Sequence, residues 1–164
     1  MQIIVMGVSG SGKSWLANRL VTATGWAFAE GDYYHSEANK ARMHAGIPLT
    51  DAERIPWLDT LHNILLEWQR TGVNGILTCS SLKASYRERL TAGLPEVRFI
   101  WLDPPYRVLA DRMAHRTGHF MPAGLLDSQL ATLEPPTADP HTLRLDGTES
   151  ADAEVHKVLA WLGH

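Results

Sequence analysis

A glycine-rich segment near the start of the chain limits the possible folds more than any other feature. Residues 7–14 read GVSGSGKS, which matches the pattern GxxxxGK[ST]. The segment follows an apolar run at residues 2–6 and precedes a helical pattern that runs from Lys13 to about Thr24, with Gly25 as a stop signal. Strand, loop and helix in this order predict a phosphate-binding loop, or P-loop, because glycines let the backbone curl with its N–H groups pointing inward.

Two residues of this loop carry distinct chemistry. The Lys13 ammonium is expected to reach the β- and γ-phosphates of a nucleotide, and the Ser14 hydroxyl is expected to bind Mg²⁺. The nucleotide-binding residues that the motif predicts are Gly7, Val8, Ser9, Gly10, Ser11, Gly12, Lys13 and Ser14. The sequence therefore predicts a site for a nucleotide with magnesium.

The composition is that of one ordinary globular domain. The 164 residues are 45% hydrophobic and 20% charged, and their net charge of −3 provides no general attraction for a polyanion. No stretch approaches the roughly 20 apolar residues of a membrane span. A single cysteine, Cys79, excludes an internal disulfide. We expect a cytoplasmic protein without a nucleic-acid or membrane partner.

Short apolar runs alternate with helical patterns along the chain, which is typical of an α/β fold with a parallel sheet covered on both faces. Further strands are predicted at residues 27–29, 75–79, 97–102 and 142–145. Further helices are predicted at residues 35–45, 51–70, 83–92, 104–116 and 150–162. Thr50 and Glu53 form a plausible capping box for the second of these helices. Residues 118–136 break the rhythm and predict a helical insertion within a single domain, residues 1–164.

Missing motifs narrow the class of P-loop protein. A switch GTPase carries Asp-x-x-Gly, which occurs nowhere in this chain, and Asn-Lys-x-Asp, for which residues 39–42 lack the final Asp. Motor and transporter ATPases usually have an acid at the end of an apolar strand, whereas residues 76–80 end in hydroxyl side chains. A small-molecule kinase is therefore favoured.

Four sequence blocks carry a more specific resemblance. They are GVSGSGKS (7–14), GDYYHSEANKARMHAGIPLTDAERIPWL (31–58), CSSLKASYRERL (79–90) and RMAHRTGHFMPAGLLDSQLATLEPP (112–136). In order and approximate spacing they resemble the gluconokinase family of the shikimate-kinase-like P-loop kinases. The resemblance implies ATP-dependent phosphorylation of D-gluconate to 6-phospho-D-gluconate, a five-stranded parallel sheet with a helical lid at about residues 117–137, and a homodimer.

Candidate residues for the acceptor follow the second predicted strand. Glu30 and Asp32 flank Gly31 at the end of that strand, where open α/β sheets place their ligands. Asp32 is the catalytic candidate that would orient the accepting primary hydroxyl and receive its proton, and Glu30 would contact Mg²⁺ through water. His35 is a candidate substrate contact that the resemblance supports. The alternative is that these are surface acids in a turn and a histidine at a helix start.

Cationic candidates lie on the segment of about residues 33–70 and just beyond it. Arg54 belongs to a block that matches the family, and its planar guanidinium suits a carboxylate. Lys83 and Arg87 are four residues apart and are expected to share a helix face. They either bind the carboxylate and the transferred phosphate or form a solvent-exposed basic stripe.

Arg112 and Arg116, again four apart, precede His119 at the opening of the insertion. In related kinases an arginine at this junction approaches the phosphates when the lid closes. The resemblance thus implies that Arg112 and Arg116 bind the nucleotide, that Arg116 is also catalytic, and that His119 binds substrate. Ordinary surface charge is the alternative.

Two other functions stay open from the sequence. One is a kinase for another small hydroxy acid, such as shikimate. The other is a catalytically silent sensor that binds ATP and a sugar acid.

Overall fold

The computed structural model describes residues 1–115, 123–136 and 139–164. Two predicted site residues, Arg116 and His119, lie outside these ranges, and so do the ends of the predicted lid.

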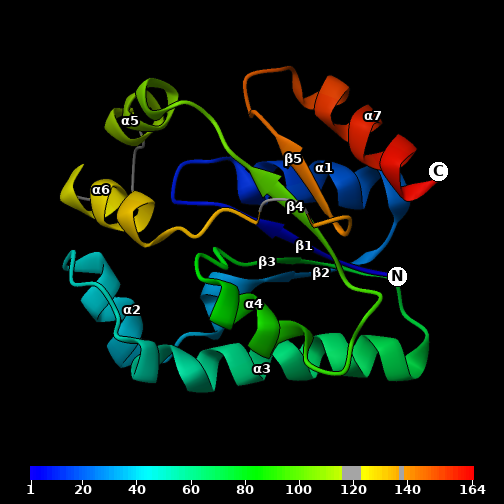
Figure 1. The fold of residues 1–164 in the computed structure, drawn as a ribbon, viewed down its shortest axis with the longest axis horizontal. Coiled ribbons are helices and arrows are strands. Elements are labelled where there is room, and N and C mark those ends of the chain that lie inside the picture. Colours follow the sequence, from blue (N-terminus) through cyan, green and yellow to red (C-terminus); the bar gives the residue numbers. More distant parts are fainter. Residues whose placement is uncertain (116–122, 137–138) are drawn as a thin grey trace.

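Five parallel strands form one sheet in the order β2-β3-β1-β4-β5 (Figure 1). Their bounds are β1 Gln2–Met6, β2 Ala27–Glu30, β3 Gly75–Thr78, β4 Arg98–Leu102 and β5 Thr142–Leu145. β1 is central and pairs with β3 and β4, and its apolar residues have almost no contact with solvent. This sheet confirms the predicted α/β architecture. Strands that are buried on both faces need continuous apolar runs, and the sequence contains such runs.

Helices cover both faces of the sheet (Figure 1). On one face, α1 (Lys13–Thr24) and α7 (Ala151–Leu162) bury Leu16, Leu20 and Val158. On the other face lie α3 (Asp51–Thr71) and α4 (Ala84–Thr91). The remaining described helices are the 3₁₀ turn η1 (Gly31–Tyr34), α2 (Glu37–His44), α5 (Tyr106–Ala114) and α6 (Ala123–Thr132). In Figure 1, α2, α5 and α6 lie at the end of the molecule toward which the strands point.

Helix boundaries near the predicted site differ from the sequence prediction in three places, one of which is the helix predicted at residues 104–116, which begins at Tyr106 as α5. The helix predicted at residues 35–45 is wrong at its start, because Ser36 caps α2 and its side chain accepts a hydrogen bond from the N–H of Asn39. His35 therefore lies between η1 and α2. Lys83 is the N-cap residue of α4 and does not belong to the helix. The predicted capping box of Thr50 is confirmed at the start of α3.

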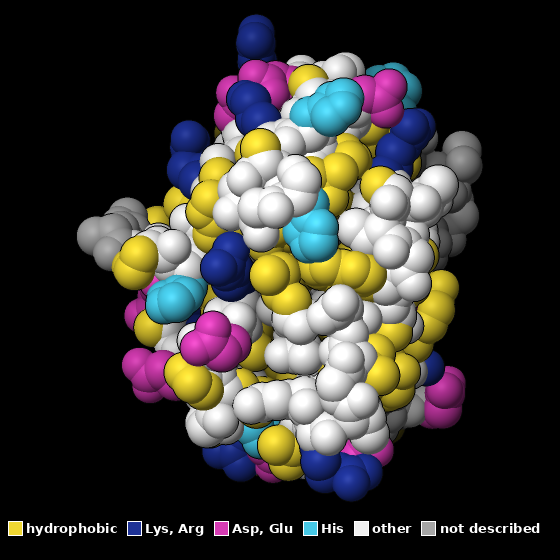
Figure 2. All heavy atoms as spheres, turned by 90° about the vertical axis from the view of Figure 1, so that its right-hand side faces the viewer, with side chains coloured by type: hydrophobic (Ala, Val, Ile, Leu, Met, Phe, Trp, Pro, Cys, Tyr) yellow, Lys and Arg dark blue, Asp and Glu magenta, His cyan; other side chains and the backbone are white. Residues whose placement is uncertain are grey.

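The opposite end of the molecule holds both termini and the amino ends of the strands (Figure 1). Figure 2 shows that basic and acidic side chains alternate around the rim of this face, with hydrophobic and uncharged groups between them. Neither sign of charge gathers on this face. Among the helices of the described ranges, none is both long and apolar enough to cross a membrane.

Candidate active site

The P-loop connects β1 to α1 through a backbone that only glycines adopt easily. Gly7, Gly10 and Gly12 have φ angles of +149°, +80° and +97°. A Cβ atom at Gly7 would lie 2.6 Å from Ser11 Oγ and 2.8 Å from the carbonyl oxygen of Leu102. The glycines of the motif therefore meet steric requirements of this turn.

Lys13 begins α1 and its side chain folds back over the loop. Its Nζ atom donates to the carbonyl oxygens of Gly7 at 3.0 Å and Val8 at 3.1 Å. This position holds the ammonium group beside the loop, where phosphate oxygens can compete with the two carbonyls. The geometry suits the role in phosphate binding that the motif predicts.

Three oxygen-bearing side chains from α1, β2 and β3 meet next to Lys13. The Ser14 hydroxyl donates to Glu30 Oε2 at 2.8 Å, and the Thr78 hydroxyl donates to Glu30 Oε1 at 2.7 Å. Glu30 and Thr78 are directly paired across β2 and β3. Many ATPases have an acid at the end of the strand that corresponds to β3. In this protein the neighbouring strand β2 supplies the acid, Glu30. Carboxylate and hydroxyl oxygens are ligands that Mg²⁺ prefers, so this cluster fits the ion.

Arg112 of α5 links the P-loop to the turn after β5. Its guanidinium donates to the carbonyl oxygens of Gly10 at 3.3 Å, Ser11 at 3.2 Å and Gly147 at 2.8 Å. The structure therefore brings this predicted nucleotide-binding residue to the loop.

Helix α6 contacts the P-loop through Gln129, a residue that the sequence analysis missed. Gln129 Oε1 accepts from the backbone N–H of Ser9 at 2.7 Å, and its Nε2 donates to Ser9 Oγ at 3.1 Å. Below this contact, Val8 packs with Leu109 and Leu126. The described part of the predicted insertion therefore packs directly on the phosphate-binding loop.

Asp32 lies in η1 with an exposed side chain, two residues beyond the end of β2. Cys79 directly follows β3, and its thiol is buried. Burial raises the pKa of Cys79 to about 11, the negative charge of Asp32 adds to the rise, and the positive charge of Lys13 opposes it.

His35 is a buried neutral base beside Asp32. Its ring stacks on Trp57 with centroids 4.0 Å apart and planes 18° apart, and only 5% of the residue is exposed. Burial lowers the pKa of His35 to about 4; Asp32 opposes the change, while Arg54 and Lys40 favour it. The buried Nδ1 atom has no hydrogen-bond partner among the described residues. A neutral imidazole nitrogen of this kind can bond to a ligand hydroxyl.

Arg54 of α3 and Lys83 converge on the ring of Tyr86. The guanidinium carbon of Arg54 and the Nζ atom of Lys83 each lie 5.6 Å from the ring centroid. Lys83 donates to both carboxylate oxygens of Asp51, at 3.0 and 3.1 Å, and the Tyr86 hydroxyl also donates to Asp51. The buried Nε of Arg54 has no partner within the part of the chain that the structure describes.

Arg87 does not join Lys83, contrary to the predicted shared helix face. Its guanidinium donates to the carbonyl oxygens of Ser81 at 2.7 Å, Leu82 at 3.2 Å and Glu134 at 2.8 Å. Lys83, the N-cap residue of α4, instead pairs with Asp51, so the two cations have different partners. Burial lowers the pKa of Arg87, consistent with an enclosed guanidinium.

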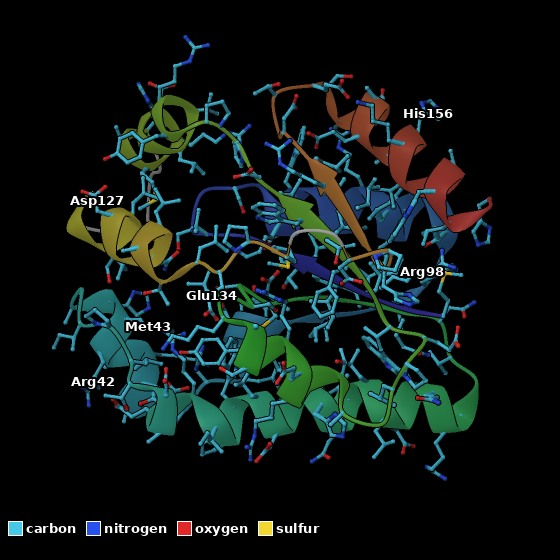
Figure 3. The ribbon with its side chains drawn as sticks, in the orientation of Figure 1. Arg42, Met43, Arg98, Asp127, Glu134 and His156 are labelled. Carbon is cyan, nitrogen blue, oxygen red and sulfur yellow. The ribbon has the colours of Figure 1, made fainter. Side chains whose placement is uncertain are left out.

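Glu134 completes this second cluster. Its Oε1 accepts from the N–H of Ala84 at 2.8 Å and so caps α4, which Figure 3 shows beside it. Arg87 and Glu134 together tie the segment after α6 to the start of α4. This contact spans 50 residues and was not predicted from the sequence.

A P-loop between strand and helix, with an acid, a neutral histidine and cations at the same edge of a parallel sheet, defines a P-loop kinase. A family model described as an AAA domain matches residues 3–136. The chain is 46% identical over 157 residues to the gluconokinase of Gluconobacter oxydans (strain 621H), which covers 96% of this chain and 88% of that protein.

Two solved structures are similar over nearly the whole chain. A sugar kinase from Janibacter sp. HTCC2649, solved without ligand, has a TM-score of 0.92 and 46% identity and covers 99% of this chain and 94% of its own. A gluconokinase from Sinorhizobium meliloti 1021 has a TM-score of 0.88 and 42% identity and covers 99% of this chain and 91% of its own. The chain belongs to the gluconokinase family, as its four sequence blocks predicted.

Proposed function

We propose that this protein uses ATP to phosphorylate D-gluconate to 6-phospho-D-gluconate. The observation that carries the proposal is the pair of unpartnered buried nitrogens, His35 Nδ1 and Arg54 Nε, near Asp32. A buried polar atom without a partner destabilises the free protein, and a ligand with hydroxyls and a carboxylate supplies what these two nitrogens lack. Membership of the gluconokinase family supports gluconate as that ligand.

In the proposed reaction, Asp32 acts on the accepting hydroxyl, and Lys13 and Arg116 act on the transferred phosphoryl group. Asp32 accepts a hydrogen bond from the primary hydroxyl, whose oxygen attacks the γ-phosphorus of ATP. The bond from that phosphorus to the bridging oxygen of the β-phosphate breaks, ADP leaves, and the hydroxyl proton passes to Asp32. Lys13 stabilises the charge on the transferred group. Arg116 is proposed to add a second positive charge, as the family resemblance implies.

The remaining cations bind the acceptor. We assign the gluconate carboxylate to Arg54 and Lys83, which approach the Tyr86 ring from two elements. His35 binds a hydroxyl group, and His119 contributes a further substrate contact. Arg87 holds the surrounding backbone. Residues of about 117–137, which include all of α6, are proposed to form a lid over the phosphates.

Ser14 and Glu30 are the proposed holders of Mg²⁺, the former directly and the latter through water. When bound, the ion neutralises phosphate charge during transfer. The hydrogen bonds of Ser14 and Thr78 to Glu30 orient this carboxylate before the nucleotide arrives. The family resemblance also supports a cytoplasmic homodimer that acts in gluconate utilisation ahead of the pentose phosphate pathway, without nucleic-acid or membrane partners. Sedimentation velocity measures the dimer directly.

A substrate panel tests the proposed function. Purified protein with ATP and Mg²⁺ should form ADP fastest with gluconate among gluconate, shikimate and other hydroxy acids. A faster reaction with shikimate would identify a different kinase. Calorimetry that detected both ATP and gluconate bound together, without any turnover, would indicate a sensor.

A further inference from the structure

A cavity of about 350 Å³ lies beside the P-loop. It is lined by Ser11, Gly12, Trp15, Arg112, Gly147 and Glu154. Ser11 and Gly12 belong to the loop that holds phosphates, and the cavity continues toward the turn after β5. A nucleotide with its phosphates in the loop would therefore place its base in this cavity.

Two flat side chains form walls of the cavity. The Trp15 indole is 51% exposed and lies under the guanidinium of Arg19, 5.0 Å from the ring centroid. The Arg112 guanidinium is held by three backbone carbonyls. An indole and a guanidinium each offer a planar surface on which an aromatic base can stack.

Glu154, in the first turns of α7, supplies a polar group to this cavity. The residue is only 4% exposed, and its buried Oε1 atom has no hydrogen-bond partner among the residues that the structure describes. Burial raises the pKa of Glu154, and nearby Asp146 and Glu149 add to the rise, whereas Arg112 and Lys157 oppose it. A buried carboxyl oxygen without a partner is unfavourable in the free protein, which indicates that a ligand donates to it.

We propose that Glu154 selects the nucleotide base by accepting a hydrogen bond from the 6-amino group of adenine at Oε1. The inference rests on the proposed function for the presence of ATP in the P-loop. Guanine carries a carbonyl oxygen at the same ring position, so in this pose it would set two acceptors against each other. The residues that bind the triphosphate make no contact with the base, so Glu154 supplies the discrimination between adenine and guanine.

The test removes the amino group from the nucleotide and the acceptor from the protein. ATP and purine riboside triphosphate, which lacks the 6-amino group, are compared by kcat/KM at saturating gluconate. The wild-type protein should prefer ATP by about 10- to 100-fold. Glu154→Ala should reduce this preference to about twofold or less, and Glu154→Gln should keep most of it because its amide oxygen still accepts.

A matched control is Asp152→Asn, which removes an exposed acid from the same helix, one that pairs with Arg19 at 3.6 Å. It should leave the nucleotide preference unchanged. If Glu154→Ala weakened both nucleotides equally, Glu154 would have only a structural role and the inference would be wrong. A wild-type preference for GTP over ATP would also overturn it.

Direct binding separates this inference from the proposed function. Calorimetry of the wild-type protein with each nucleotide, without gluconate, should give the same preference for ATP even if gluconate is not the acceptor. Equal affinities for ATP and purine riboside triphosphate would overturn the role of Glu154 and leave the kinase activity in place. This measurement needs no variant and so does not depend on the folding of Glu154→Ala.

Discussion

The phosphate side and the acceptor side of the site differ in how their polar groups are satisfied. On the phosphate side, Lys13 donates to two loop carbonyls, Ser14 donates to a carboxylate, and the Ser9 amide donates to Gln129, whereas Ser11 Oγ is buried without a partner among the described residues. On the acceptor side, His35 Nδ1 and Arg54 Nε are buried without a hydrogen-bond partner among the described residues.

This difference indicates how each side contributes to binding. Phosphate oxygens must displace contacts that the protein already makes, so the phosphate side exchanges one set of hydrogen bonds for another. The acceptor side gains hydrogen bonds only when the ligand supplies them. A site whose buried groups need a particular partner rejects ligands that lack it. The unpartnered nitrogens of the acceptor side should therefore determine substrate choice, whereas Lys13 and Asp32, which act on the transferred group and on the hydroxyl proton, should determine rate.

Replacing Lys13 with Ala should have the largest effect on rate. We expect kcat to fall by about 100- to 1000-fold, because the variant loses the positive charge next to the transferred group. A coupled assay of ADP formation measures this loss. The control is Lys157→Ala on α7, whose ammonium pairs with Glu149 at 2.7 Å. Equal activities of the two variants would contradict the role of Lys13.

Asp32→Asn should lower the rate of phosphoryl transfer without changing the affinity for ATP. We expect kcat to fall by about 100-fold, since the amide cannot receive the hydroxyl proton. ATP affinity, measured by calorimetry, should change by less than about twofold, within ordinary variation for a distant group. Glu37→Gln on the exposed face of α2 is the control. A parallel loss of ATP affinity would place Asp32 on the phosphate side instead.

His35 should make folding sensitive to acid. Its ordinary pKa of 6.5 is lowered to about 4 in the folded protein. Between these values the unfolded chain takes up a proton that the folded protein excludes, so stability is present above pH 6.5 and is lost as the pH falls toward 4. The loss from this group is on the order of 3 kcal/mol.

Urea unfolding at several pH values measures the effect of His35. His35→Phe keeps an aromatic ring on Trp57 and cannot titrate, so its free energy of unfolding should fall less between pH 7 and pH 4.5 than that of the wild-type protein. Identical pH profiles would show that His35 is not excluded from protonation.

Two arginines provide the smallest and most specific comparison. Arg54→Lys should raise KM for gluconate by about tenfold, because an ammonium group cannot replace a planar guanidinium at a carboxylate. Arg87→Lys should instead lower the free energy of unfolding by about 1–2 kcal/mol, because hydrogen bonds to backbone carbonyls are lost. Steady-state kinetics and urea unfolding of both variants test this. A loss of stability in Arg54→Lys together with a raised KM in Arg87→Lys would contradict both assignments.

Local patterns predicted the elements that carry the site. The bounds of β1 and β5 and the Thr50 capping box follow from runs of neighbouring residues, and the structure confirms them. The 3₁₀ turn at Asp32 was not predicted, because four residues are too few for a helical period to emerge.

Contacts between distant segments were beyond this reasoning. Gln129 lies 120 residues after the Ser9 amide that it contacts, and Thr78 lies 48 residues after Glu30. For the contact between Thr78 and Glu30, the sequence offered one indication, which was a hydroxyl side chain at the end of β3 where many ATPases have an acid. No periodicity in one sequence indicates which distant side chain will complete such a pair.

The sequence by itself determined the parallel sheet, the P-loop and the family of this protein, because glycine spacing and apolar runs act on neighbouring residues. Only the tertiary structure decided which polar groups have partners. It turned Arg87 toward carbonyls, left Arg54 Nε without a partner among the described residues, and buried Glu154 beside the P-loop. The physical reason is that burial and hydrogen bonding depend on segments that meet only after the sheet and its covering helices have packed.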